Sequence, residues 1–139
     1  MHVRVASRRR RAVGLSVLVL ACSLVLACNR QAEPGGDIAV AWVIEPAPPA
    51  ANAPGVVRVT LRDPQQQLIR GGRLQLEGQM SHPGMAPVLA PLVEQADGTY
   101  QAPFQFTMAG DWVLVVTGEL PGVGRITRQI EVAGVRPAS

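Results

Sequence analysis

The sequence predicts an all-β fold, an antiparallel β-sandwich of about seven strands that follows a signal peptide. From residue 37 onward, apolar and polar residues alternate in short runs, which is the period of a half-buried strand. Residues that favour turns separate these runs at intervals of about 8 to 12 residues, as in β-sandwiches. No stretch of this region repeats its apolar residues with the period of a helix.

Seven strands are expected, and local sequence features indicate where several of them end or pair. The expected strands cover residues 38–44, 57–61, 74–80, 88–96, 100–106, 112–117 and 126–132. The Pro/Ala-rich stretch 45–54 is interpreted as a stiff connection within one domain. Because proline lacks an amide hydrogen, Pro91 predicts that the fourth strand lies at a sheet edge. The pair Asp97-Gly98 predicts a two-residue hairpin, and Trp42 and Trp112 are expected in the core.

Residues 1–27 are predicted to be a lipoprotein signal peptide. An arginine-rich start precedes an apolar run of 16 residues, 12–27, which is shorter than the roughly 20 residues of a usual membrane span. The run ends in Val25-Leu26-Ala27-Cys28, which resembles the bacterial lipobox and implies cleavage before Cys28 and lipidation of that cysteine. An uncleaved membrane anchor is the alternative interpretation.

These features predict an exported protein that is lipid-anchored to a membrane of the cell envelope and faces the periplasm. Asn29, after the lipidated cysteine, favours the outer membrane under the enteric sorting rule. The polar stretch 28–36 contains proline and glycine and is interpreted as a tether. The domain is expected over residues 37–134, followed by a frayed tail at 135–139.

Composition narrows the functional classes. The calculated pI of 9.7 reflects the arginines of the leader, since eight arginines stand against ten acidic residues from Cys28 onward, a net charge of −2. Nucleic-acid binding therefore loses its electrostatic support. The sequence also lacks a Gly-x-Ser-x-Gly elbow, a phosphate loop and a paired-carboxylate motif, so we expect no enzyme activity.

The candidate binding residues are Met80, His82, Met85 and Met108. His82 is the only histidine after the leader, and thioether and imidazole groups are ligands that Cu(I) prefers. Gly84 is expected to allow a turn with positive φ between them. A packing alternative stands beside this hypothesis, because Met80 and Met108 are in phase with core residues and methionine fills core gaps well.

Four segments of the chain resemble the YtkA-like / FixH-like domain family. They are Arg58-Val59-Thr60-Leu61-Arg62-Asp63, residues 80–87, Asp97-Gly98-Thr99-Tyr100-Gln101-Ala102 and residues 106–112. The resemblance covers about residues 56–132 and implies an immunoglobulin-like sandwich that faces the periplasm or the outer surface. Some relatives, FixH among them, are linked to copper supply and terminal-oxidase assembly. FixH-type proteins carry a membrane-spanning anchor, whereas this chain has a lipobox.

Two functional hypotheses follow. The first is a non-catalytic envelope lipoprotein that binds Cu(I) through the Met/His loop in copper handling. The second is a membrane-tethered interaction or structural module without a metal. In that case the strand with Pro91, or the Pro-rich connection 45–54, would contact an envelope protein partner.

Overall fold

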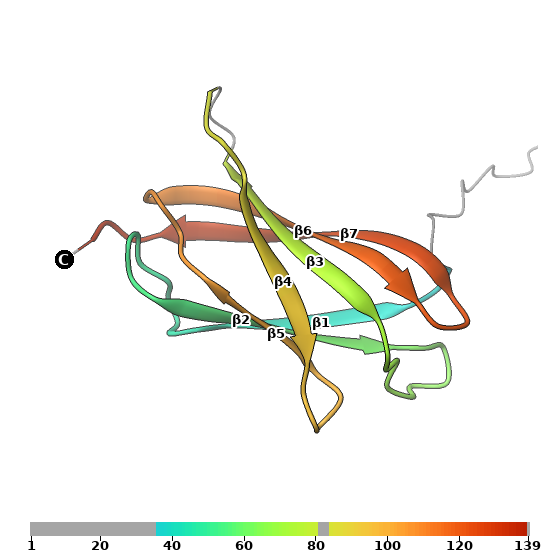
Figure 1. Cartoon of the computed structure of the whole chain (residues 1–139). Coiled ribbons are helices and arrows are strands. Elements are labelled where there is room, and N and C mark those ends of the chain that lie inside the picture. Colours follow the sequence, from blue (N-terminus) through green and yellow to red (C-terminus); the bar gives the residue numbers. More distant parts are fainter. Residues whose placement is uncertain (1–35, 81–83, 139) are drawn as a thin grey trace, which may run out of the picture. The chain divides into compact units, whose positions relative to one another are not determined.

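Seven antiparallel strands and no helix make up the described part of the chain, residues 36–80 and 84–138 of the computed structural model (Figure 1). The strands are β1 (Ala39–Glu45), β2 (Gly55–Arg62), β3 (Arg73–Met80), β4 (Val88–Glu94), β5 (Tyr100–Phe104), β6 (Gly110–Leu120) and β7 (Gly124–Val135). The all-β prediction is therefore confirmed. No helix in the described residues is long and apolar enough to cross a membrane.

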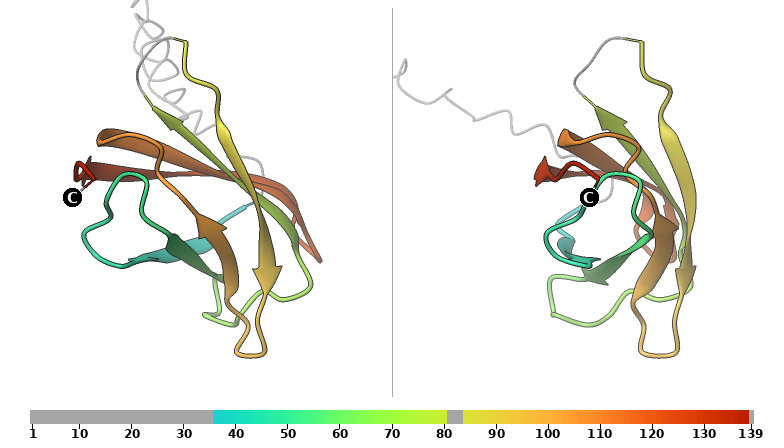
Figure 2. Two further views of the ribbon diagram at one scale, coloured as in Figure 1. Left: turned by 60° about the vertical axis from the view of Figure 1, so that its left-hand side comes forward. Right: turned by 90° about the vertical axis from the view of Figure 1, so that its left-hand side faces the viewer.

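The strands form two layers that β4 connects. Their order is β1-β2-β5-β4-β3-β6-β7, in which every pairing is antiparallel. Strands β1, β2 and β5 form one layer, and β3, β6 and β7 form the other (Figure 2). This order is the immunoglobulin-like arrangement that was expected.

The core lies between the two inner faces and consists almost entirely of aliphatic and aromatic side chains. Its fully buried large residues are Tyr100, Leu61, Leu76, Leu114, Ile126, Val57, Val59 and Val116. No buried side-chain nitrogen or oxygen atom in the described residues lacks a hydrogen-bond partner. This core lies within the compact unit Ala32–Ser139, so that segment has what a domain needs to fold alone.

The prediction that β4 is an edge strand is wrong, because β4 lies between β3 and β5 in the strand order. Pro91 nevertheless has one side without a neighbouring strand, as it would have at a sheet edge. β5 pairs with β4 only at Val93 and Glu94, so no strand lies beside Pro91 on the side away from β3. A proline needs no hydrogen-bond partner on that open side.

The hairpin between β4 and β5 has three loop residues, and the two-residue prediction is wrong. The amide of Gly98 donates to the carbonyl of Gln95 at 2.9 Å, and the amide of Gln95 donates to the carbonyl of Thr99 at 2.7 Å. Gly98 therefore takes the third loop position, where its φ of 82° is left-handed. This arrangement is a turn followed by a glycine in the bulge position.

Trp42 and the C-terminal segment also differ from expectation. Trp42 is 42 % exposed, although its cross-strand partner Val59 is fully buried. Trp42 thus lies on the inner side of β1 at the lateral edge of the sandwich. The ordered chain also continues past residue 134, because Val135 is buried and Arg136 exchanges backbone hydrogen bonds with Pro49 and Ala51. The predicted fraying of these two residues is wrong.

Candidate metal site

The connections β1–β2, β3–β4 and β5–β6 lie at the same end of the sandwich as the C-terminal end of β7 (Figures 1 and 2). This end carries Met80, Met85 and Met108, and we call it the methionine end. The predicted ligand His82 lies outside the described residues, as do the leader, the tether and the predicted lipidation site Cys28. The structure therefore places three of the four candidate ligands.

Met80 is the last residue of β3 and packs against the margin of the core. Its cross-strand partner is Trp112 of β6, which is buried. Its terminal methyl carbon lies 3.3 Å from the position that a Cβ atom on Gly110 would occupy. The packing interpretation therefore explains Met80, which is partly buried.

Met108 lies in the connection between β5 and β6, and its side chain is 48 % exposed. The indole nitrogen of Trp112 donates a hydrogen bond to the Met108 carbonyl at 3.0 Å, which fixes the backbone at this position. The packing alternative, under which Met108 fills a gap in the core, does not fit this exposure. The alternation of apolar and polar residues extends to Met108, but the opposite layer of the sandwich ends before this residue.

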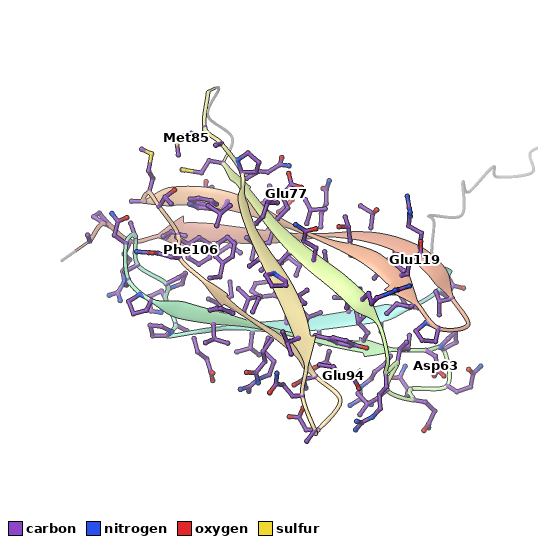
Figure 3. All side chains as sticks on the ribbon, in the orientation of Figure 1. Asp63, Glu77, Met85, Glu94, Phe106 and Glu119 are labelled. Atoms are coloured by element: carbon purple, nitrogen blue, oxygen red, sulfur yellow. The ribbon has the colours of Figure 1, made fainter. Side chains whose placement is uncertain are left out.

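Met85 precedes β4, directly after Gly84, and is 36 % exposed. Gly84 has a φ of 89°, so the expected turn with positive φ is confirmed. Figure 3 shows Met85 at the same end of the sandwich as Phe106, which belongs to the connection that also carries Met108. The fold therefore places Met108 at the same end of the sandwich as Met80 and Met85, which precede it by more than 20 residues in the sequence.

Three aromatic rings form the base of the methionine end. Phe104, Phe106 and Trp112 contact one another edge to face, with centroid distances of 5.0 Å, 5.4 Å and 6.3 Å. A Cβ atom on Gly78 would overlap the Phe104 ring, so only glycine leaves room for that ring against β3. Sequence reasoning did not identify this cluster, although Phe104 and Phe106 lie shortly before Trp112 in the chain.

The donors at this end suit a soft metal ion. Thioether sulfur atoms bind Cu(I) and are poor ligands for hard cations such as Mg²⁺ and Ca²⁺. No group of three or more His, Cys, Asp or Glu residues that could hold a metal ion occurs in the described ranges 36–80 and 84–138. The three candidate ligands that the structure does place are all thioethers.

The opposite end of the sandwich is held by polar contacts between loops, and we call it the tyrosine end. The Tyr100 hydroxyl donates to the Ile69 carbonyl at 2.9 Å and accepts from the Gly72 amide at 3.0 Å. Burial raises the pKa of the Tyr100 phenol above its ordinary value, and the hydrogen bond from Gly72 opposes this effect. The hydroxyl thus has two backbone partners.

A second set of contacts at the tyrosine end connects the hairpin after β4 to the segment before β3. A carboxylate oxygen of Glu94 accepts from the Gly71 amide at 2.7 Å. The Arg70 guanidinium donates to the Ala96 carbonyl at 3.2 Å and 3.3 Å and lies 3.7 Å from the Glu94 carboxylate. These contacts position two loops and leave the tyrosine end with a structural role.

Comparison with known proteins identifies the family. A family model described as YtkA-like matches residues 36–117. The chain belongs to the YtkA-like family. No curated protein matches this YtkA-like chain significantly. Its fold is similar to the crystal structure of a DUF4426 family protein from Pseudomonas aeruginosa PAO1, with 17% identity and a TM-score of 0.52. The match covers 75% of this chain and 94% of that chain and shows the fold alone.

Proposed function

We propose that this YtkA-like protein is a non-catalytic envelope lipoprotein that binds Cu(I) at the methionine end. The thioethers of Met80, Met85 and Met108 and the imidazole of His82 supply the ligands. The observation that carries the proposal is the placement of all three methionines at one end of the sandwich, with Met85 and Met108 exposed.

Packing does not account for the two exposed methionines. An apolar side chain stabilises a fold in proportion to the area that it removes from water, and Met108 remains 48 % exposed. The exposed thioethers of Met85 and Met108 are therefore accessible to an ion, whereas the Met80 side chain is partly buried at the margin of the core. Thioether ligation also needs no thiol, which suits an oxidising compartment.

The lipid anchor at Cys28 holds the domain close to the membrane. Ten residues, 29–38, separate Cys28 from the first residue of β1. A fully extended chain of that length spans at most about 35 Å. β1 begins at the tyrosine end, so the methionine end lies one strand length of seven residues, roughly 23 Å, from the point where the tether joins the domain. A tether of this reach allows the domain to turn its methionine end toward a membrane-bound donor or acceptor of copper without release of the protein.

The metal is tested by titration of the segment Ala32–Ser139 with Cu(I) in competition with a chromophoric chelator. Binding weakens in Met85→Leu, Met108→Leu and His82→Ala, because each change removes one soft donor while a leucine retains the side-chain volume. Val93→Met is the matched control, since it adds an exposed thioether near the far end of β4 and leaves the affinity unchanged. Failure of the wild-type segment to compete, or equal affinity in all variants, contradicts the proposal.

The anchor is tested separately by metabolic labelling of the full chain with palmitate. The label enters the wild-type protein and is absent from Cys28→Ala. Labelling that persists in Cys28→Ala contradicts lipidation at this cysteine and leaves the copper proposal untouched.

The exposed outer face of β4 supports a second candidate function, an interaction module. Leu89 and Val93 are each 56 % exposed, and Pro91 between them is exposed as well. Val93 also lines an open groove of about 540 Å³ together with Gly72 and Thr117. A photoreactive residue at position 89 captures an envelope protein under this hypothesis, whereas one at Thr127 on β7 captures none.

The Pro-rich connection is a weaker contact candidate than β4. Ala51 is buried, and the amide of Asn52 donates to the Phe106 carbonyl at 2.7 Å. The connection is thus fastened to the domain along part of its length.

A further inference from the structure

We propose that two copies of this protein associate through antiparallel pairing of their β1 strands. β1 is the last strand of the order at its side of the sandwich, and in the described part of the chain it pairs with β2 alone. Every second amide and carbonyl group of such a strand points away from its one neighbour and can pair with a further strand.

The composition of β1 leaves this edge unprotected. Its sequence is Ala-Val-Ala-Trp-Val-Ile-Glu, with no proline, no glycine and one charged residue, at its end. Trp42 and Val43 are exposed, and so is Ala41. Natural sheets protect their edges with charges, prolines or bulges, and a regular apolar edge without them favours association with another strand.

The other terminal strand, β7, provides the contrast within the same molecule. It carries Arg125 and Glu131 at exposed positions, and Gly134 interrupts it with a positive φ. The chain directly after β7 is covered as well, because Arg136 forms backbone hydrogen bonds with Pro49 and Ala51. β7 thus carries charges within the strand, a glycine interruption and a covered end, whereas the one charge of β1 is Glu45 at its end.

A second copy fits β1 because the strand is complementary to itself. The register that pairs all seven residues places Trp42 opposite Trp42 of the second copy on the two-fold axis. It places Val40 opposite Ile44, Ala41 opposite Val43, and Glu45 opposite Ala39. No like charges therefore face each other, and Glu45 is already 3.8 Å from Arg58 of its own chain. Aromatic and β-branched cross-strand pairs stabilise such a pairing.

Ala41 and Val43 allow a test of this register without disturbing the core. Both point outward, since their partners in β2 are Thr60 and Arg58 on the outer face. Ala41→Glu with Val43→Glu places like charges opposite each other twice in the dimer. Ala41→Lys with Val43→Glu places opposite charges there instead. The two variants share Glu at position 43 next to Arg58 and differ only at residue 41.

The experiment is sedimentation velocity of the segment Ala32–Ser139 from micromolar to millimolar concentration. This segment contains no cysteine, so disulfide-linked dimers cannot arise. The contact centres on the seven residues of β1 in each copy, fewer than the roughly 20 to 30 residues per partner of a standard interface. We therefore expect a concentration-dependent dimer in the wild type. The Glu/Glu variant remains monomeric, and the Lys/Glu variant associates at least as strongly as the wild type. Leu89→Glu on β4 leaves association unchanged.

Far-ultraviolet circular dichroism and a cooperative denaturant transition verify that each variant remains folded. A wild-type segment that is monomeric at all concentrations overturns the proposal. Equal association of the Glu/Glu and Lys/Glu variants overturns it as well, because the register requires residue 41 to face residue 43.

Discussion

The two ends of the sandwich are built on different principles. At the tyrosine end, hydrogen bonds and an ion pair connect the loops through Tyr100, Glu94 and Arg70. At the methionine end, an aromatic base supports the strands, and Met85 and Met108 remain exposed above it. The side chains of the tyrosine end are engaged in contacts that stabilise the fold. Among the described residues, the thioethers of Met85 and Met108 at the methionine end make no such contacts.

This difference separates structural residues from candidate ligands. A perturbed pKa would make Tyr100 a candidate functional residue, because burial raises the pKa of its phenol. Its hydroxyl is engaged by Ile69 and Gly72, so the perturbation has a structural cause. Met108 shows no unusual electrostatics, yet its exposed side chain lacks a packing explanation. Unexplained exposure is the better guide to function in this domain.

The largest effect is expected from Trp112→Ala, which removes the base of the methionine end. Trp112 is buried and contacts Phe104 and Phe106, and truncation of a buried tryptophan costs about 3 to 5 kcal/mol. Denaturant unfolding measures the loss. A loss below that of Tyr100→Phe would contradict the view that the aromatic base supports this end.

Tyr100→Phe is expected to cost about 1 to 3 kcal/mol, because the Gly72 amide and the Ile69 carbonyl lose their partner. The wild type should also lose stability at alkaline pH. The folded state raises the phenol pKa above the ordinary value of about 10, so this contribution is present below pH 10 and is lost as the pH rises past it.

Because Tyr100 is the only tyrosine, the absorbance of its phenolate reports on this group alone. Thermal unfolding of the wild type and of Tyr100→Phe from neutral to alkaline pH measures the effect on stability. A phenol that titrates at its ordinary value in the folded protein would contradict the structural role given to its burial.

Glu94→Ala tests the second contact of the tyrosine end and should cost about 1 kcal/mol. The change removes the acceptor of the Gly71 amide and the partner of Arg70, and exposed ion pairs add little in water. Urea unfolding at low and high salt separates the two terms, since salt screens only the ion pair. A salt-dependent loss alone would show that the hydrogen bond to Gly71 contributes nothing.

The smallest effect on stability is expected from Met85→Leu and Met108→Leu. Substitutions at exposed positions usually change stability by less than about 0.5 kcal/mol, and both side chains are exposed. The same variants should lose Cu(I) affinity. A large loss of stability in Met108→Leu, measured by denaturant unfolding, would restore the packing interpretation.

Much of the fold could be predicted from the alternation of residues, and the exceptions share one cause. Alternation indicates which face of a strand a residue occupies, but it does not indicate how far the opposite layer extends over that face. Trp42 and Met108 are both in phase with the core, and both lie where coverage ends. Pro91 reflects a related limit, because composition cannot reveal that β4 pairs with β5 only at its end.

The candidate site could be predicted in its members but not in its geometry. Residue chemistry singled out Met80, His82, Met85 and Met108, and the structure places the three methionines at one end of the sandwich. The roles of the three could not be assigned beforehand, since the partial burial of Met80 depends on its pairing with Trp112, and the exposure of Met108 depends on how far the opposite layer extends. The aromatic base likewise depends on Gly78, which leaves space for Phe104 across the sandwich.

The most direct measurement is X-ray absorption at the copper edge of the Cu(I)-loaded segment Ala32–Ser139, compared with Met85→Leu and Met108→Leu. Ligation at the methionine end predicts sulfur scatterers in the wild type and one fewer in each variant, while the circular dichroism of the fold remains unchanged. A spectrum with nitrogen and oxygen scatterers only, identical in all three proteins, would contradict the assignment of the exposed methionines as ligands.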